Sequence, residues 1–320
     1  MATVITKISD IGDMKEVFGK YMIEETTKYA KLISSGIATP DPKIAALINE
    51  GGKTINLPSW DGDLTSDEDE VLLDGGAMPV SKITAFNDVA VKHLRGRGFG
   101  ASDLSAFFAG DDPMGAILEC VGKYWARNMQ RCLLSTLNGV FANTELAKTN
   151  VLDNATGVIS YETLTAAMYL LGDHYESLTT IAMHSAVMNK LAQLRLLETY
   201  PNPVDRTPFY TSLLGKQVIV DDSLTPDEGG KYPIYLFGAG SVAYNEATGI
   251  INVETDRDKQ AGVDYLFTRR AFTMHPRGVK WIGTPAGETP TNAELAVGTN
   301  WELVGKPKNI RIALLKTKIA

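Results

Sequence analysis

The stretches Lys53-Thr-Ile-Asn-Leu-Pro-Ser-Trp60 and Val80-Ser-Lys-Ile-Thr-Ala-Phe-Asn-Asp-Val-Ala-Val-Lys-His-Leu94 flank an acidic segment, Asp61-Gly-Asp-Leu-Thr-Ser-Asp-Glu-Asp-Glu70. Together they predict a long β-hairpin over residues 51–94 with an acidic tip. A two-stranded ribbon is marginal in water unless a third surface buries one of its faces. The residues that follow predict a helix of about 30 residues instead of further strands. We therefore expect the hairpin to lie on another molecule, which is typical of an assembly subunit.

The composition is that of a globular protein, with 44% hydrophobic and 22% charged residues in a chain of 320. A formal net charge of −7 argues against a broad, sequence-independent grip on nucleic acid. Residues 1–25 lack the apolar core of a signal peptide. No apolar stretch approaches the ~20 residues that span a bilayer. We expect a soluble protein, intracellular when made, without a membrane partner.

Helical periodicity predicts three helices before the middle of the chain. The first covers residues 9–34 and carries Phe18 and Met22 on its apolar face. Asp41-Pro42 predicts a short helix to Asn49, because aspartate caps a helix and proline suits its first turn. Asp112-Pro113 begins the long helix, which we expect over 112–145. Its two cysteines, Cys120 and Cys132, lie about 18 Å apart along that helix, too far for a disulfide, and are expected to be reduced and core-facing.

The rest of the chain predicts an α/β block followed by strands. Residues 95–100 predict a turn and 103–109 a short segment before the long helix. The α/β block covers about 147–245, with helices beginning at Ser160 and Ser185. The expected strands are 179–184, 217–220, 232–237, 249–254, 263–274 and 309–316, with a charged turn at 255–262.

Motifs for catalysis or for cofactors are weak. Gly52-Lys53-Thr54 ends like a phosphate-binding loop, but position 47, where its first glycine belongs, is Leu47. The four histidines have no metal-ligand spacing, and no serine sits in a nucleophile elbow. The acidic tip lacks the twelve-residue calcium-loop pattern and is interpreted as a solvated or partner-facing loop. We therefore expect no enzyme activity, no catalytic residues, no cofactor and no metal.

The last third of the chain carries a resemblance to a known family. Arg269-Arg-Ala-Phe-Thr-Met-His-Pro-Arg-Gly-Val-Lys-Trp281, Thr289-Pro-Thr-Asn-Ala-Glu-Leu295, Asn300-Trp-Glu-Leu303 and Pro307-Lys-Asn-Ile-Arg-Ile312 resemble, in this order, the major capsid proteins of tailed bacteriophages. Ile181-Ala-Met-His-Ser-Ala-Val-Met188 and Val218-Ile-Val-Asp-Asp222 resemble the same family. The likeness covers nearly the whole chain, although no single motif is diagnostic.

The resemblance implies an α+β fold, the tailed-phage major capsid fold. Its implied divisions are an N-terminal arm (1–50), an extended β-hairpin loop (51–94), a peripheral domain with a long spine helix (95–146), an α/β axial domain (147–245), and peripheral-domain strands with a C-terminal strand (246–320). The implied function is that of a major capsid protein that assembles with itself as pentamers and hexamers into an icosahedral shell around double-stranded DNA. The protein would be found in the virion capsid and assembled in the host cytoplasm.

The same resemblance implies contact residues and partners. The extended loop would contact a neighbouring subunit through Trp60, Asp61, Asp63, Leu64, Val71, Leu72 and Leu73. The turn with Asp256, Arg257, Asp258 and Lys259 would meet its copies near three-fold axes, and Phe18 and Met22 would make contacts of the arm. About 50 residues before the hairpin are too few for a built-in scaffold, so a separate scaffolding protein and a portal are expected, with a decoration protein as a further partner. Two alternatives stay open: a bacterial encapsulin-type nanocompartment shell, and a cytosolic α/β enzyme.

Overall fold

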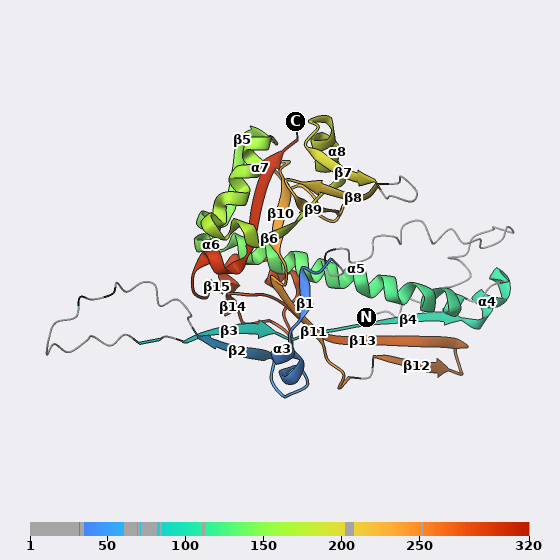
Figure 1. Cartoon of the computed structure of the whole chain (residues 1–320). Coiled ribbons are helices and arrows are strands. Elements are labelled where there is room, and N and C mark those ends of the chain that lie inside the picture. Colours follow the sequence, from blue (N-terminus) through green and yellow to red (C-terminus); the bar gives the residue numbers. More distant parts are fainter. Residues whose placement is uncertain are drawn as a thin grey trace.

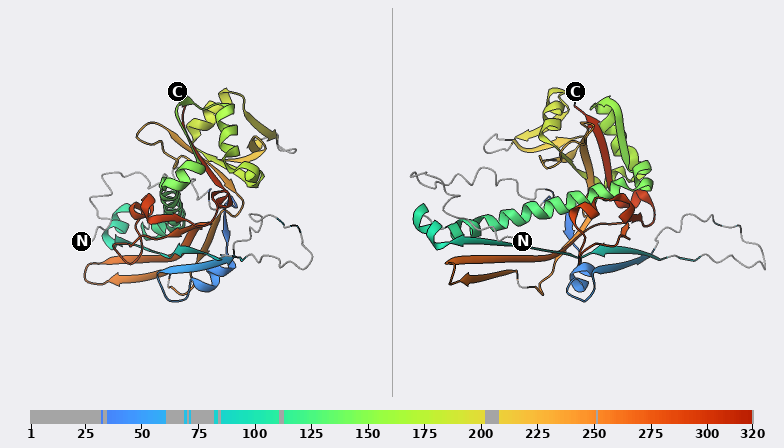
Figure 2. Two further views of the ribbon diagram at one scale, coloured as in Figure 1. Left: turned by 90° about the vertical axis from the view of Figure 1, so that its left-hand side faces the viewer. Right: turned by 180° about the vertical axis from the view of Figure 1, so that it is seen from behind.

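The computed structural model describes residues 32, 35–60, 69, 71, 82–83, 85–110, 113–201, 208–250 and 252–319. The predicted helix over 9–34, with Phe18 and Met22, lies outside these residues except for Leu32, which is fully buried. Figure 1 shows the long helix α5 crossing the molecule, with one sheet below it and a second sheet above one of its ends. The hairpin of β2 (Thr54–Trp60) and β3 (Ala85–Val91) and the short helix α4 (Asp103–Ala109) lie at opposite ends of the molecule (Figure 2).

Helix α5, Pro113–Ala142, has 30 residues and confirms the predicted long helix. At 1.5 Å per residue it is about 45 Å long. Met129, Cys132 and Leu137 recur at helical spacing and lie in the main core, and Trp125 on the same stripe is also buried. Cys120, near the N-terminal end of the helix, is only partly buried, so the prediction of two core-facing thiols is correct for Cys132 alone.

The sheet below α5 is built around β13, Val263–Pro276, the longest strand. On one side of β13 lie β12 (Val253–Asp258) and β11 (Val242–Glu246), which pairs with β1 (Ala38–Pro40). On the other side β4, His93–Ser102, pairs with β13 along its whole length. The predicted turn over 95–100 is therefore wrong, because these residues lie inside β4.

The second sheet has seven strands. Their order is β5 (Val151–Val158), β16 (Ile312–Lys318), β10 (Tyr232–Gly238), β6 (Leu178–Met183), β9 (Lys216–Val220), β8 (Pro208–Leu213) and β7 (Leu197–Pro201). β16 lies between β5 and β10, because its run Ile312–Leu315 is apolar on both faces and is buried on both. In the structure β16, the C-terminal strand of the predicted segment 246–320, belongs to this sheet, and β11 belongs to the sheet below α5. The predicted division at residue 245 stays a prediction. The other domain boundaries stay predictions.

Several predicted helix starts are confirmed by their caps. Asp41 accepts a hydrogen bond from Lys43 N at 2.9 Å and caps α3, Pro42–Leu47. Ser160 forms a capping box with Thr163 at the start of α7, Tyr161–Met168. In α8, Ser185–Gln193, the cap is His184 rather than the predicted Ser185, because the imidazole Nδ1 accepts from Ala186 N.

The remaining elements are short. They are α4 (Asp103–Ala109), α6 (Thr144–Thr149), η2 (Tyr169–Ser177), α9 (Asn292–Leu295), η3 (Gly298–Asn300), η4 (Pro307–Ile310), the pair β14 (Val279–Trp281) and β15 (Trp301–Leu303), and the hairpin β2 (Thr54–Trp60) and β3 (Ala85–Val91). α9 and η3 pack closely against the C-terminal half of α5, where a Cβ added to Gly139 would overlap the carbonyl oxygen of Leu295.

Two buried histidines predict that the fold loses stability in acid. Burial lowers the pKa of His93 to about 3 and that of His275 to about 4, against an ordinary value of 6.5. Both imidazoles are therefore neutral in the folded chain at pH 5, whereas the unfolded chain binds protons as the pH falls below 6.5. The contribution of the two neutral histidines to the free energy of unfolding is fully present above about pH 6.5. It is lost as the pH falls toward their folded-state pKa values of about 4 and about 3. Between pH 7 and pH 5 each histidine should remove about 2 kcal/mol from the free energy of unfolding.

Guanidinium unfolding of the unassembled subunit at pH 7, 6 and 5 measures how steeply the free energy of unfolding changes with pH. The pair His93→Gln and His275→Gln should flatten it, while His174→Gln, at an exposed histidine, should leave it unchanged. The same pH dependence in the wild type, in the double variant and in His174→Gln would contradict the role given to His93 and His275.

Candidate assembly surfaces

The predicted hairpin is present, with β2 antiparallel to β3 and a register that runs from Thr54 opposite Val91 to Trp60 opposite Ala85. Its second arm is shorter than expected. The hairpin ends at Val91, and after Lys92 the chain joins the sheet below α5 as β4 at His93.

The root of the hairpin lies on its own chain. Ile55, Leu57 and Ala90 are buried in a small core with Ile44 of α3 and Ala271 of β13. Half-buried Asp88 adds a polar anchor, because its carboxylate accepts a hydrogen bond from Gly278 N at 3.0 Å, and burial raises its pKa. The expectation that the hairpin has no surface of its own to lie on is therefore wrong for its root, where α3 and β13 supply that surface.

The outer end of the hairpin is different. The alternation of buried and exposed residues along β2 stops after Leu57, and Pro58, Ser59 and Trp60 are all exposed. Trp60 is 70% exposed, and Val71 beyond it is 90% exposed. The other predicted contact residues of the loop lie outside the described residues: Asp61, Asp63, Leu64, Leu72 and Leu73. The described part of the outer end thus presents large apolar side chains to the surroundings.

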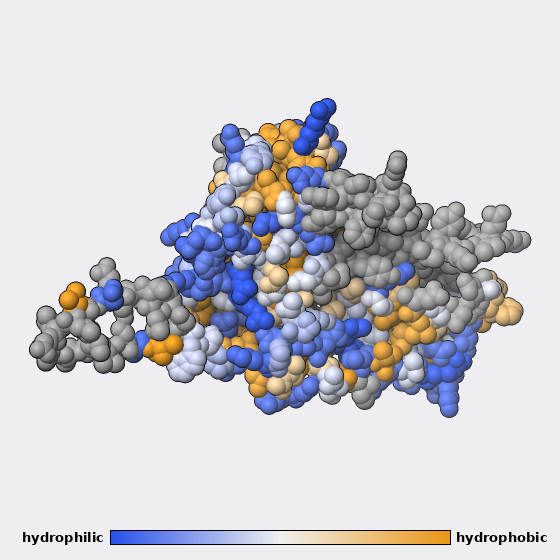
Figure 3. Space-filling model, in the orientation of Figure 1, coloured by the Kyte–Doolittle hydropathy of each residue, from blue (hydrophilic) through white to orange (hydrophobic). Residues whose placement is uncertain are grey.

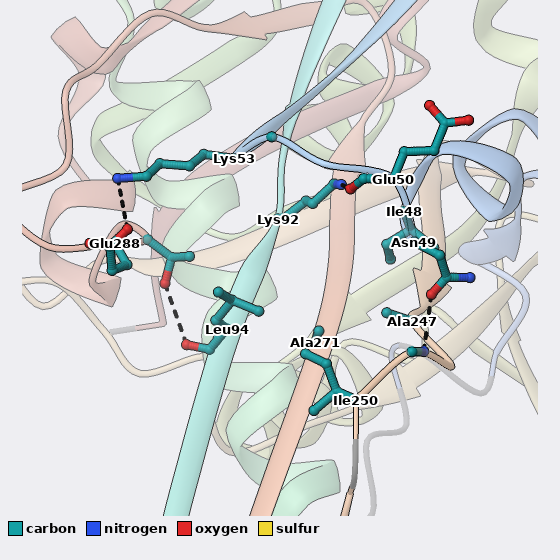
Figure 4. Close-up of a pocket in the computed structure, with 13 residues that line it drawn as sticks. Ile48, Asn49, Glu50, Lys53, Lys92, Leu94, Ala247, Ile250, Ala271 and Glu288 are labelled. Atoms are coloured by element: carbon teal, nitrogen blue, oxygen red, sulfur yellow. Dashed lines mark hydrogen bonds and ion pairs between the residues drawn. The ribbon is translucent and has the colours of Figure 1, made fainter.

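A pocket of about 250 Å³ opens beside the hairpin root (Figure 4). Ile48, Ala247, Ile250, Ala271 and Leu94 supply most of its apolar lining. A salt bridge of 2.8 Å between Lys53 Nζ and Glu288 stands at its edge. The space is sufficient for one large side chain, and the rest of the lining includes the polar residues Asn49, Glu50, Lys92 and Thr289.

A glycine track continues from this pocket along β4. Gly96 and Gly98 lie opposite Arg269 and Phe267 of β13. Thr268 lies between Phe267 and Arg269 on β13, so its side chain points to the opposite face of the sheet, where it accepts a hydrogen bond from Trp125 of α5. Gly96 and Gly98 therefore belong to the sheet face turned away from α5. A Cβ on Gly98 would lie 3.0 Å from the Phe267 ring.

The sequence signal for this track is the alternation of the glycines in Arg95-Gly-Arg-Gly-Phe-Gly100, which we interpreted as a turn. Alternate glycines in a strand strip one sheet face of side chains and allow another backbone to approach closely. Here the Phe267 ring lies against Gly98 and the Arg269 side chain lies beside Gly96, so side chains of β13 occupy the space that the glycines leave. Phe267 itself is 37% exposed.

The predicted three-fold turn lies at the far end of the same sheet. β12 continues to Asp258, so Asp256, Arg257 and Asp258 are strand residues and only Lys259 belongs to the turn. Arg257 donates to both carboxylate oxygens of Asp264, at 2.8 and 2.9 Å, and also pairs with Asp103. These ion pairs raise the pKa of Arg257. Arg257 therefore braces its own chain, whereas Lys259 is an exposed side chain of the turn.

Among the described residues, no group of three or more His, Cys, Asp or Glu side chains could hold a metal ion. Burial raises the pKa of the Cys132 thiol to about 11, so it is protonated at neutral pH and packs as an apolar side chain. The described helices include none that is both long enough and apolar enough to cross a membrane.

Comparison with known proteins identifies the family. The family Gp13-like, described as "Major capsid protein 13-like", matches residues 60–310. A curated "Major capsid protein" of Bacillus phage SPP1 is 42% identical over 324 residues, covering 98% of each chain. The predicted resemblance to tailed-phage major capsid proteins is confirmed.

Solved structures share the fold at low sequence identity. A chain from Mycobacterium phage Ogopogo has a TM-score of 0.54 at 9% identity, covering 90% of this chain and 92% of that one. The capsid of a native GTA particle has a TM-score of 0.54 at 12% identity, covering 90% of each chain. The holo-SrpI encapsulin complex from Synechococcus elongatus also has 0.54, at 7% identity, covering 100% of this chain and 93% of that one. The fold alone therefore does not separate a virus shell from a nanocompartment, but the sequence matches do: the chain belongs to the major capsid protein 13-like family.

Proposed function

We propose that this protein assembles with itself, as pentamers and hexamers, into an icosahedral shell that encloses double-stranded DNA. The family supplies the class of protein. The observation that carries the proposal is the exposed outer end of the hairpin, where Trp60 is 70% exposed beyond a root that is buried. A rigidly rooted ribbon with an uncovered tryptophan at its far end is suited to reach a neighbouring subunit.

The hairpin of one subunit lies on the sheet face of the next. The face of β4 and β13 on which the partly exposed Phe267 ring lies against Gly98 offers an apolar surface for this contact. The pocket at the hairpin root has room for one apolar anchor. Trp60, Asp61, Asp63, Leu64 and the run Val71–Leu73 supply the contacts on the loop side.

Two further contacts complete the shell. The turn at the end of β12, with Asp256, Asp258 and Lys259, meets its copies near three-fold axes, with Arg257 holding the turn in shape. The N-terminal segment contributes Phe18 and Met22. Because the same subunit must close both five-fold and six-fold rings, we expect the hairpin to adjust while the two sheets stay rigid.

The shell also implies partners of other kinds. A separate scaffolding protein guides closure, a portal occupies one vertex, and a decoration protein binds from outside. Packaged DNA is enclosed without specific binding, in keeping with the net charge of −7. Assembly takes place in the host cytoplasm, and the mature protein is in the virion capsid.

The alternative function is a nanocompartment shell that encloses an enzyme. The SrpI encapsulin shares the fold as closely as the phage capsids do and is therefore compatible with this alternative, whereas the 42% identity to a phage major capsid protein favours the virion. Portal and packaging-motor genes beside this gene would support the virion, and a cargo-enzyme gene would support the nanocompartment.

Negative-stain electron microscopy of the purified protein, alone and with its candidate scaffolding protein, tests the proposal. We expect closed shells, or rings of five and six subunits, in at least one condition. A monodisperse monomer under both conditions, across the concentration range used for assembly, would contradict it.

A further inference from the structure

The outer side of helix α5 carries a row of cations, which we call the basic ridge. It consists of Lys123, Arg127 and Arg131, which follow one another at steps of four residues and therefore share one face of the helix. Arg131 is exposed, and Lys123 and Arg127 are partly exposed. Residues 120–142 of α5 contain no aspartate or glutamate. The basic ridge is thus a run of positive charge in a chain whose net charge is −7.

The basic ridge points away from the sheet below α5. Met129 is buried in the main core, and Arg127 and Arg131 precede and follow it by two residues. At 3.6 residues per turn, two residues turn the helix by about 200°, so the two arginines lie on the side opposite Met129. Trp125 holds the buried side of the helix to the sheet, because its Nε1 donates to Thr268 of β13 at 3.2 Å.

The composition of the basic ridge distinguishes nucleic acid from protein as its partner. None of the large apolar side chains between residues 120 and 142 is exposed. A protein interface typically has an apolar centre with a polar rim, whereas a surface that binds DNA is polar and positively charged. The basic ridge fits a polyanion better than it fits another folded protein.

We propose that the basic ridge is a contact surface for the phosphate backbone of double-stranded DNA on the inner side of the shell. This inference rests on the proposed function, which supplies the enclosed DNA. At 1.5 Å per residue the three cations are spaced about 6 Å apart, over about 12 Å in all. Each strand of a duplex carries one charge per ~3.4 Å of its axis. The basic ridge can therefore engage several phosphates without reading the base sequence.

The other side of the same sheet is suited to face outward. Figure 1 shows α3 below the sheet and α5 above it, and Ile44 of α3 packs in one core with Ala271 of β13. Asp256 and Asp258 of β12 point to the side of α3, and hydrophilic side chains cover this end of the sheet (Figure 3). The hairpin that we propose to lie across this side adds the six carboxylates of residues 61–70. Because these charges repel DNA, the DNA belongs on the side of α5.

A single basic ridge should bind DNA weakly. With three phosphate contacts, the binding constant should fall by about 40-fold between 50 and 200 mM salt. Isolated subunits are therefore not expected to hold DNA at physiological salt, in agreement with their negative net charge. The contact becomes effective when many copies line one surface and act together.

Photo-cross-linking in DNA-filled particles tests the proposal. A photoreactive benzoylphenylalanine replaces Arg131 in one preparation and Lys43, an exposed residue of α3, in a second. The particles are treated with nuclease to remove outside DNA and irradiated, and the protein–DNA adducts are then quantified. We expect at least about tenfold more adducts from position 131 than from position 43. Equal yields, a higher yield from position 43, or adducts from position 131 with protein only would overturn the proposal.

Charge variants separate electrostatic attraction from packing. With the photoreactive residue at position 131, Arg127→Gln should lower the adduct yield by about threefold or more, because one phosphate contact is lost. Arg127→Lys keeps the charge and should leave the yield unchanged. Lys43→Gln changes the net charge by the same amount as Arg127→Gln and should also have no effect. An unchanged yield with Arg127→Gln would overturn the proposal.

Two further results keep this inference separate from the proposed function. Lys123, replaced by the photoreactive residue, is a second position on the basic ridge and should give adducts as position 131 does. DNA-filled particles without adducts at either position would overturn this inference alone. Particles that assemble without DNA would instead refute the proposed function, and this inference with it.

Discussion

A chain that lacks residues 61–70 is expected to fold normally and to form no stable shells. The subunit should survive because the root of the hairpin is held by its own core, with Ile55 and Ala90 buried against α3 and β13. Assembly should fail because the deletion removes the acidic segment and draws Trp60 back from its place on the neighbour. The thermal midpoint of the isolated subunit and the particle count in electron micrographs measure the two halves of this prediction.

Two controls sharpen this result. Replacing 61–70 by ten Gly/Ser residues keeps the length of the loop and tests its chemistry alone. Trp60→Ala, at a side chain that is 70% exposed, should change the free energy of unfolding by less than about 0.5 kcal/mol. The same substitution should weaken each subunit contact by about 2 kcal/mol or more if Trp60 is an interface anchor. Normal particles from the deletion would refute the role of the hairpin.

The second large effect is expected from Gly139→Ala, which should destabilise the subunit by about 3 kcal/mol or more. A Cβ at this position of α5 would overlap the carbonyl oxygen of Leu295 and lie 2.7 Å from Trp301 Nε1. That nitrogen donates a 2.8 Å hydrogen bond to the same carbonyl. The clash is with backbone, so α9 must move away from α5 and the hydrogen bond must lengthen.

The same helix offers the matched control. Gly122 is exposed, and a Cβ added there meets nothing within 4 Å. Gly122→Ala should therefore stabilise the subunit by about 0.5–1 kcal/mol, the ordinary gain of alanine over glycine in a helix. Chemical denaturation of both variants gives the two differences. Equal effects for the two substitutions would show that the close approach of α9 to α5 is not present in solution.

The sequence predicted those elements whose signals are local. Asp41-Pro42 and Ser160 are caps and begin helices where expected, and the apolar stripe of α5 is buried as its period indicated. The family likeness also proved correct, because it depended on the order of many weak segments.

The errors fall where distant segments decide the structure. Residues 95–100 have a composition typical of a turn, yet pairing with β13 holds them extended, because their glycines leave room for Phe267. The apolar pattern of β16 would suit a strand of either sheet. Only its pairing with β5 and β10 assigns it to the seven-stranded sheet. No local pattern specifies these partners.

The candidate site was predicted in part. The hairpin was predicted from its two β-rich arms, and Trp60 was named as a contact residue of the loop. The exposed apolar face of α4 was not predicted, because Leu104, Phe107 and Phe108 have the helical spacing of a buried stripe. Only the structure shows that Ser105 is the buried residue. Sequence periodicity reports that a face is apolar, and it does not report whether the chain itself covers that face.

A cryo-electron microscopy map of assembled shells would show whether the hairpin of one subunit lies on the next. We predict that the strand pair 54–60 and 85–91 leads outward from its own α3, with Trp60 in contact with the sheet face of an adjacent copy. A map in which Trp60 lies in solvent, or against its own subunit, would contradict this account.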